Sequence, residues 1–360
     1  MTILKYLKVI LQNIIVEYLI LIRKPAGLIF ALFLPTIILV VFGISFPGET
    51  LDITYPRIVI IEDENNQTLV SSLKEKISPE DFNLEVRRGD QSTLEELVKS
   101  KEYLLGIYPE LSLSHQPPKI TIVVDNSNPL ARDTVLDKVM PQIVEIEDSF
   151  ILQKDAYEKD LRFIDYLFPG ITAFGIMFFC LSLASIGVVR ERISGSLERI
   201  RSSPLPLWVF LISKYTAYSL LAAIAGVLIL IGGRFLFNIS IAGPIWLVIL
   251  LEILGAAPFI GLALITSTIG RSEFEAQVII LFISLPLVFI SGIFFPIQCM
   301  PDYVQNVVKF FPLTYSVEGL RDVIIRDLGL FEILPVLNML ILYSLLFFIF
   351  AVLIFRKRER

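Results

Sequence analysis

Six long runs of apolar residues constrain this chain more than any other feature. They span Ala26–Ile44, Ile171–Val189, Tyr215–Gly232, Ile245–Ile269, Val278–Phe295 and Ile333–Phe355. A helix needs about 20 mostly apolar residues to cross the roughly 30 Å hydrocarbon core of a bilayer. Each run is apolar around its whole circumference, whereas an ordinary core helix is apolar along one stripe. The sequence therefore predicts an α-helical membrane protein with six transmembrane helices.

Composition and motifs exclude several other classes. Apolar residues make up 55% of the chain, which is too many for a disordered protein, and two cysteines cannot support a disulfide scaffold. A net charge of −5 gives no reason to expect nucleic-acid binding. The sequence has no G-x-x-x-x-G-K-[ST], H-E-x-x-H or C-x-x-C motif, and its one histidine, His115, cannot build a multi-histidine metal site. We therefore predict no catalytic residue, no metal ligand and no cofactor on this chain.

Basic residues favour one orientation across the membrane. With the N-terminus in the cytoplasm, fourteen basic residues face inward: Lys5, Lys8, Arg23, Lys24, Arg190, Arg192, Arg199, Arg201, Lys214, Arg271, Arg356, Lys357, Arg358 and Arg360. The short outer connections carry only four, Arg234, Lys309, Arg321 and Arg326. Because cytoplasmic loops are enriched in Lys and Arg, both termini, including the basic tail 356–360, are predicted to be cytoplasmic. The expected location is the plasma or inner membrane of a cell.

Residues 1–25 precede the first predicted span, 26–44, and have an amphipathic pattern. One side carries Leu4, Leu7, Leu11, Ile14, Tyr18 and Ile22, and the other carries Lys5, Lys8, Gln12 and Glu17. A signal peptide is the alternative, but Arg23-Lys24-Pro25 stands where a small-residue cleavage site would be required. We expect a helix that lies along the inner leaflet and contacts lipid.

The polar stretch 45–165 between the first two runs is predicted to be an extracytoplasmic α/β domain. It carries 13 basic and 24 acidic residues. Short β-branched runs predict strands at 57–61, 103–108 and 119–124, and a helix is expected at 92–100, capped by Ser92 or Thr93. A long helix is expected from about 129 to 157. The remaining five spans are predicted to form one domain, 166–355.

The segment 190–205 follows the second span and is strongly charged. Gly195 permits a sharp change of direction, residues 196–203 could form two helical turns, and Pro204 would end them. A short charged helix held close to the membrane suits docking on a soluble partner. The alternative is a solvated loop whose arginines only set the orientation.

The order of these elements resembles the permease subunit of type-2 ABC exporters, in the subgroup with a large extracytoplasmic domain between the first and second spans. The best local matches are Arg190-Glu191-Arg192 with Gly195-Ser196-Leu197-Glu198-Arg199 and Pro204, then Ser291-Gly292-Ile293-Phe294-Phe295-Pro296, then Phe311-Pro312-Leu313-Thr314-Tyr315-Ser316 with Leu320-Arg321. The resemblance implies that Glu191, Arg192, Gly195, Ser196, Glu198, Arg199 and Pro204 couple the chain to an ABC ATPase. It also implies outer helices within 297–332.

Two groups inside the predicted spans are candidates for further roles. Glu252 lies well inside the fourth run, and Arg234 ends the third at the outer side, so we predict that the two side chains pair. The pair is either a step on a substrate or cation path or a structural contact. Phenylalanines of the second and fifth runs could line an amphiphile path between two subunits, or could pack in the core or against lipid: Phe174, Phe178, Phe282 and Phe289.

The resemblance implies a transporter permease that is not itself an enzyme. Two such chains, identical or closely related, would enclose a path and move substrate outward, and ATP with Mg would be bound by the separate ATPase. The alternative is a membrane-anchored ligand sensor or assembly scaffold without transport activity. Dependence on an ATPase partner would distinguish the two functions.

Overall fold

The computed structural model describes residues 3–23, 33, 35–38, 40–41, 57–63, 66–77, 83–100, 103–110, 119–125, 139, 150–155, 162–202, 206–294, 297, 300 and 302–357. The chain divides into two compact units. The first comprises Met1–Ile44, Leu167–Phe294 and Lys309–Arg360, and the second comprises Ser45–Tyr166 and Phe295–Val308.

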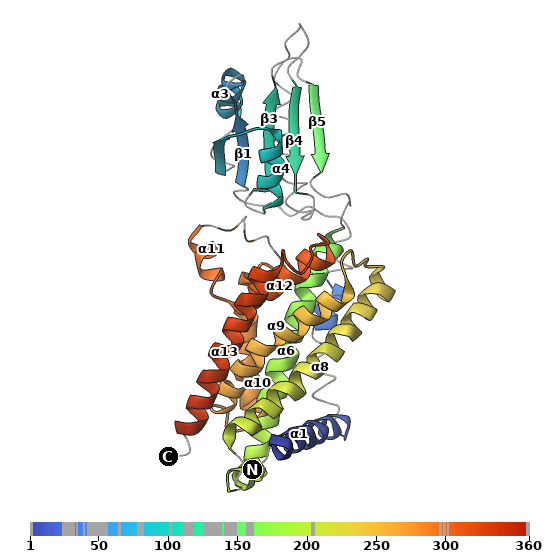
Figure 1. Cartoon of the computed structure of the whole chain (residues 1–360), viewed down its shortest axis with the longest axis vertical. Coiled ribbons are helices and arrows are strands. Elements are labelled where there is room, and N and C mark those ends of the chain that lie inside the picture. Colours follow the sequence, from blue (N-terminus) through green and yellow to red (C-terminus); the bar gives the residue numbers. More distant parts are fainter. Residues whose placement is uncertain are drawn as a thin grey trace. The chain divides into compact units, whose positions relative to one another are not determined.

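The first unit is helical (Figure 1). Its helices are α1 (Ile3–Arg23), α6 (Phe163–Ile193), α7 (Ser196–Arg201), α8 (Leu207–Phe237), α9 (Ile245–Ser267), α10 (Glu273–Ile290), α12 (Pro312–Ile324) and α13 (Leu334–Lys357). Five of them, α6, α8, α9, α10 and α13, are long and apolar enough to cross a membrane. The chain is therefore a multi-pass membrane protein. Most of the first apolar run, 26–44, lies outside the described residues, so the sixth span stays a prediction.

Helix α9 packs against α8, α12 and α13. Small residues permit these contacts: a Cβ at Gly255 would press on Ser316 of α12, and one at Gly261 would collide with Tyr215 of α8 and Phe347 of α13. Helix α6 is almost wholly buried, whereas most residues of α10 and α13 are only partly buried or are exposed. The bundle thus has a buried interior and two faces suited to lipid or to another protein.

The second unit contains a five-stranded sheet in the order β2-β1-β3-β4-β5. The strands are β1 (Arg57–Glu62), β2 (Asn83–Arg88), β3 (Leu105–Glu110), β4 (Lys119–Val124) and β5 (Phe150–Asp155), with helices α3 (Gln67–Lys76), α4 (Gln91–Lys99) and α11 (Asp302–Val308). Strand β1 is parallel to β2 and β3, β4 is antiparallel to β3, and β5 is parallel to β4.

Helices α3 and α4 cover opposite faces of this sheet, because successive residues of a strand point to opposite sides. Ile58 and Ile60 of β1 share a buried cluster with Val70 and Leu73 of α3. Val59 and Ile61 instead share one with Leu94 and Val98 of α4. The expected α/β organisation and the strands at 57–61 and 119–124 are confirmed, whereas the strand expected at 103–108 lies two residues later, at 105–110.

Two expectations for this unit are wrong. Helix α4 begins at Gln91 and is capped by Asp90, whose Oδ1 accepts from the Thr93 backbone N–H at 2.9 Å, so neither Ser92 nor Thr93 is the cap. Residues 150–155 form β5 and not the end of a long helix, because they pair in parallel with β4. Pairing with a neighbouring strand overrides local propensity in such segments. The rest of that expected helix, apart from residue 139, lies outside the described residues.

Candidate functional site

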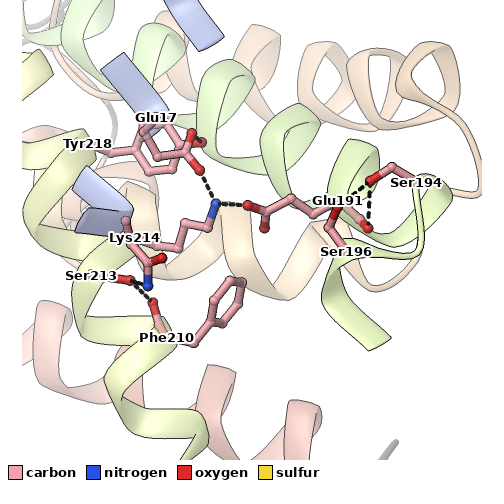
Figure 2. A network of polar contacts seen from close by, with 9 residues as sticks. Glu17, Glu191, Ser194, Ser196, Phe210, Ser213, Lys214 and Tyr218 are labelled. Atoms are coloured by element: carbon pink, nitrogen blue, oxygen red, sulfur yellow. Dashed lines mark hydrogen bonds and ion pairs between the residues drawn. The ribbon is translucent and has the colours of Figure 1, made fainter. Parts of the chain in front are cut away.

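A buried lysine joins three helices near the start of α8. Lys214 is 2% exposed, and its Nζ donates to Glu191 Oε1 at 2.6 Å and to Glu17 Oε1 (Figure 2). The Tyr218 hydroxyl, one turn farther along α8, donates to Glu17 Oε2 at 3.0 Å. We call Glu17, Glu191, Lys214 and Tyr218 the lysine cluster. It ties α1, α6 and α8 together through side chains far apart in the sequence.

Two further contacts support the lysine cluster. The Asn13 side-chain amide of α1 donates to Ser213 Oγ of α8 at 3.3 Å. Gly187 of α6 lies against the Tyr218 hydroxyl, and a Cβ at this glycine would collide with that oxygen. The sequence thus provides a glycine where α6 and α8 approach each other closely.

The lysine cluster holds α1, α6 and α8 together through buried polar contacts. Breaking a buried ion pair by removing one partner is strongly destabilising, because the remaining charge is left uncompensated in a poorly polarisable interior. Here one ammonium serves two carboxylates, and Glu191 Oε2 is buried with no partner in the described part of the chain. Within those same ranges, no group of three His, Cys, Asp or Glu side chains is placed to hold a metal ion.

Three consecutive residues at the end of α6 contact three different parts of the bundle. Arg190 forms a double hydrogen bond with the Glu273 carboxylate of α10, at 2.9 Å for each. Glu191 joins the lysine cluster, and Arg192 donates to the backbone oxygens of Thr268 and Gly270 beyond α9. The family resemblance implies that Glu191 and Arg192 take part in coupling to an ATPase. In this structure both side chains are engaged inside the chain.

Helix α7 follows directly and is the expected short charged helix. Gly195 adopts a φ of +69°, a left-handed conformation that favours glycine, and turns the chain between α6 and α7. The hydroxyls of Ser194 and Ser196 lie 2.9 Å apart across this turn. Leu197 is buried in a cluster with Val188 and Phe210, so α7 is fixed to the bundle.

Two charged side chains on the outer side of α7 are exposed among the described residues. Glu198 and Arg199 are exposed, and the Arg199 guanidinium donates only a long 3.5 Å hydrogen bond back to the Ser194 carbonyl. Pro204, the expected end of this segment, lies outside the described residues. The structure therefore separates the predicted coupling residues into an inner pair, Glu191 and Arg192, and an outer pair, Glu198 and Arg199.

The predicted pair of Glu252 and Arg234 is not formed. Arg234 is exposed and donates to the Ile239 carbonyl at 3.2 Å, at the end of its own helix. Glu252 is 1% exposed, and neither of its carboxylate oxygens has a hydrogen-bond partner among the described residues. The carboxyl packs instead against Gly226, about two turns before Arg234 on α8.

The four candidate phenylalanines do not share a surface. Phe174 and Phe178 are buried in α6, with ring centroids 5.8 Å apart. Phe282 and Phe289 of α10 are exposed, Phe282 by 77%. In this arrangement only the α10 pair is available to lipid, a second subunit or a substrate.

The sequence analysis does not identify Glu17 as a site residue. It uses Lys214 only as one of the basic residues that indicate the orientation across the membrane. The pattern predicts Glu17 on the polar side of α1, but its side chain is buried against α8. A signal is present: Lys214 stands immediately before a long apolar run, where an unpaired ammonium would be costly. The partner cannot be read from spacing, because Glu17 lies in a different helix.

Comparisons with known proteins cover most of the chain. The model of the family described as ABC-2 family transporter protein matches residues 25–353. The chain is 22% identical over 342 residues to the probable multidrug ABC transporter permease YbhS of Escherichia coli K12, covering 90% of this chain and 89% of that protein. It is 20% identical over 317 residues to the probable multidrug ABC transporter permease YbhR of the same organism, covering 83% and 85%.

A eukaryotic protein is also similar over part of its length. ABC transporter G family member 20 of Dictyostelium discoideum is 24% identical to this chain over 272 residues. The match covers 75% of this chain but only 37% of the Dictyostelium protein.

Proposed function

Since this chain belongs to the ABC-2 family of transporter proteins, we propose that it exports its cargo with ATP hydrolysed by a separate ATPase subunit. The chain is a membrane permease subunit of an ABC transporter. One observation carries the proposal. Helix α7 exposes Glu198 and Arg199 immediately beyond the end of α6, where the chain is bonded to α1, α8 and α10.

In the proposed mechanism the ATPase docks on the outer pair of α7. ATP and Mg are bound by that partner, and closure of two ATPase subunits moves α7. Leu197 fixes α7 to α6 and α8, and the lysine cluster fixes α1 and α8 to α6. A displacement of α7 would therefore tilt several helices together and open the path outward.

The proposed topology has six spans and both termini in the cytoplasm. Helix α1 would lie along the inner leaflet, since Leu11, Ile15 and Ile22 are exposed while Glu17 is turned into the protein. Exposed apolar side chains on such a helix suit acyl chains. The second unit would be extracytoplasmic. The basic residues at the end of α6 and α13 support this orientation.

A complete transporter would contain two permease chains, identical or closely related. The exposed apolar faces of α10 and α13 can meet lipid or the second chain. For cargo we propose apolar or amphiphilic small molecules, because two relatives are named as probable multidrug permeases. Phe282 and Phe289 would be the α10 side chains available to such molecules.

The test is cargo-stimulated ATP hydrolysis by the permease reconstituted with its ATPase. We expect Glu198→Ala combined with Arg199→Ala to abolish the stimulation while the permease still folds. The matched control is Glu96→Ala, which removes an exposed glutamate from α4 in the other unit. Unchanged stimulation in the α7 variant would refute the docking site.

Topology is tested separately by labelling a cysteine placed at Ser202, an exposed residue just after α7. We expect labelling only when the reagent has access to the cytoplasm. Labelling of intact cells by an impermeant reagent would show that Ser202 faces outward and would contradict the proposed orientation. Hydrolysis of ATP by the purified chain alone would contradict a separate ATPase.

A further inference from the structure

Glu252 is an acidic residue inside the bundle that the proposed coupling mechanism does not use. It lies on the second turn of α9, about 10 Å along the helix from Ile245 at a rise of about 1.5 Å per residue. The side chain is 1% exposed, and both carboxyl oxygens are inaccessible to water. Glu252 is the only charged residue of α9.

The opposite helix makes room for this carboxyl. A Cβ at Gly226 of α8 would collide with the carboxyl carbon and both carboxyl oxygens of Glu252. The carboxyl thus occupies the volume that any other residue at position 226 would fill. Neither a water molecule nor a metal ion fits between the carboxyl and the backbone of α8.

No ionisable side chain on the helices packed against α9 compensates Glu252. These side chains are Lys214, Tyr215, Tyr218 and Arg234 on α8, Glu273 and Glu275 on α10, Tyr315, Glu318, Arg321 and Asp322 on α12, and Tyr343, Arg356 and Lys357 on α13. Helix α6 also contacts α9 and carries Asp165, Tyr166, Cys180, Arg190, Glu191 and Arg192. Among the described residues none forms a hydrogen bond or ion pair with Glu252. Two basic side chains of these helices are engaged elsewhere: Arg234 with the Ile239 carbonyl, and Arg321 with the Ile293 carbonyl at 2.8 Å.

An isolated carboxylate in such surroundings is very costly, and proteins neutralise it when they cannot pair it. A proton is the one neutralising ligand that adds almost no volume. We propose that Glu252 is a proton-binding site, occupied while α8 and α9 are closed on its carboxyl. When these helices separate, water reaches the group and the acid releases its proton to that water, leaving a carboxylate. Closure then requires the proton to return.

Occupancy by a proton does not depend on the proposed function, whereas its release during transport does. The first test is infrared spectroscopy of the full-length permease in lipid vesicles near neutral pH. We expect the carbonyl stretch of a protonated carboxylic acid, absent in Glu252→Gln. Glu273→Gln is the control, since Glu273 is paired with Arg190 at the edge of the bundle and its removal should leave the band. Identical spectra of wild type and Glu252→Gln would overturn the proposal.

The thermal stability of the same variants gives a second, independent readout. Glutamine has the shape of a protonated glutamic acid, so Glu252→Gln is expected to unfold within about two degrees of wild type. If Glu252 were instead ionised and paired with a cation, Glu252→Gln would leave that cation without its counter-charge. The thermal unfolding midpoint would then fall steeply. A steep fall would therefore also overturn the proposal.

Release of the proton is tested by the pH dependence of transport in the reconstituted complex. We expect wild-type transport to slow as pH rises, because return of the proton becomes limiting, and Glu252→Gln to lose this dependence. Parallel pH profiles would refute release while leaving the infrared result intact. Absence of wild-type transport at every pH, with the band present, would count against the proposed function and not against the proton site.

Discussion

Lys214 and Glu252 are two buried ionisable residues on neighbouring helices, and the protein accommodates them in opposite ways. Lys214 of α8 has carboxylates from α1 and α6 and a supporting tyrosine. Glu252 of α9 has a glycine opposite and no polar partner among the described residues. Equal burial therefore says little about the role of an ionisable residue. What decides its role is whether other helices bring partners to it.

The largest loss of stability should follow from removing Lys214, the buried charge that has partners. Lys214→Met leaves Glu17 and Glu191 facing each other in the interior, and we expect a loss of about 3–5 kcal/mol in stability. The measurement is the unfolding midpoint and folded yield of the purified permease. Lys309→Met is the control, since that lysine is exposed and its loss should change stability by less than about 0.5 kcal/mol.

A triple variant that removes all three charges of the lysine cluster tests the cause of this loss of stability. If electrostatic imbalance causes the loss, Lys214→Met combined with Glu17→Gln and Glu191→Gln should recover most of it, because no uncompensated charge remains. A triple variant as unstable as Lys214→Met would show instead that packing of the lysine stem dominates. That outcome would weaken the contrast with Glu252.

A moderate loss of stability is expected when Gly226, the glycine opposite Glu252, is replaced. Gly226→Ala places a methyl group into the carboxyl, and overpacking of this kind costs about 1–3 kcal/mol. Gly232→Ala is a matched control on the same helix, because its added Cβ meets no atom within 4 Å. That control should be neutral or stabilising by up to about 1 kcal/mol. Equal unfolding midpoints for the two variants would contradict the close contact of Gly226 with Glu252.

A smaller loss of stability is expected when an ion pair that is accessible to water is broken. The side chains of Arg190 and Glu273 are 33% and 46% exposed. Arg190→Gln should therefore lower stability by about 1 kcal/mol or less, although the geometry of this pair is better than that of the lysine cluster. A loss of stability as large as that caused by Lys214→Met would show that the geometry of an ion pair, and not its burial, determines how much the pair stabilises this protein.

The smallest effect is expected in the second unit, at the cap of α4. Hydrogen bonds from the hydroxyl and backbone N–H of Thr93, and then from Ser92, lower the pKa of Asp90 from 3.8 to about 2. Because the pKa is lower in the folded state, the cap contributes fully above pH 3.8 and its contribution is lost as pH falls towards 2. Hydrogen exchange of the α4 amides should show this loss. Asp90→Asn, which keeps a capping oxygen but does not titrate, should remove the acid dependence.

The sequence predicts the parts of this protein that depend on local pattern. Helix length and continuous apolar character identify α6, α8, α9, α10 and α13, and β-branched runs identify β1, β3 and β4. Gly195 and the charges on either side of it are sufficient to indicate α7. Each of these features requires only residues close together in the chain.

Features that depend on distant residues escape sequence reasoning. Residues 150–155 form a strand only because β4 is available to pair with them, and nothing in the local pattern indicates β2. Glu17 belongs to the lysine cluster because α1 packs on α8, almost 200 residues along the chain. The predicted topology brings Arg234 near Glu252, but Arg234 bonds within its own helix end and Glu252 has no partner among the described residues.

The length of α6 has a mechanical consequence. Its 31 residues form a rod about 46 Å long, so a rotation of only about 5° displaces one end by roughly 4 Å relative to the other. The lysine cluster clamps α1 and α8 to the same end of this rod. In the proposed mechanism, a partner that displaces α7 would therefore act on one end of a long helix, and a small rotation there would move the other end by more than the width of an atom.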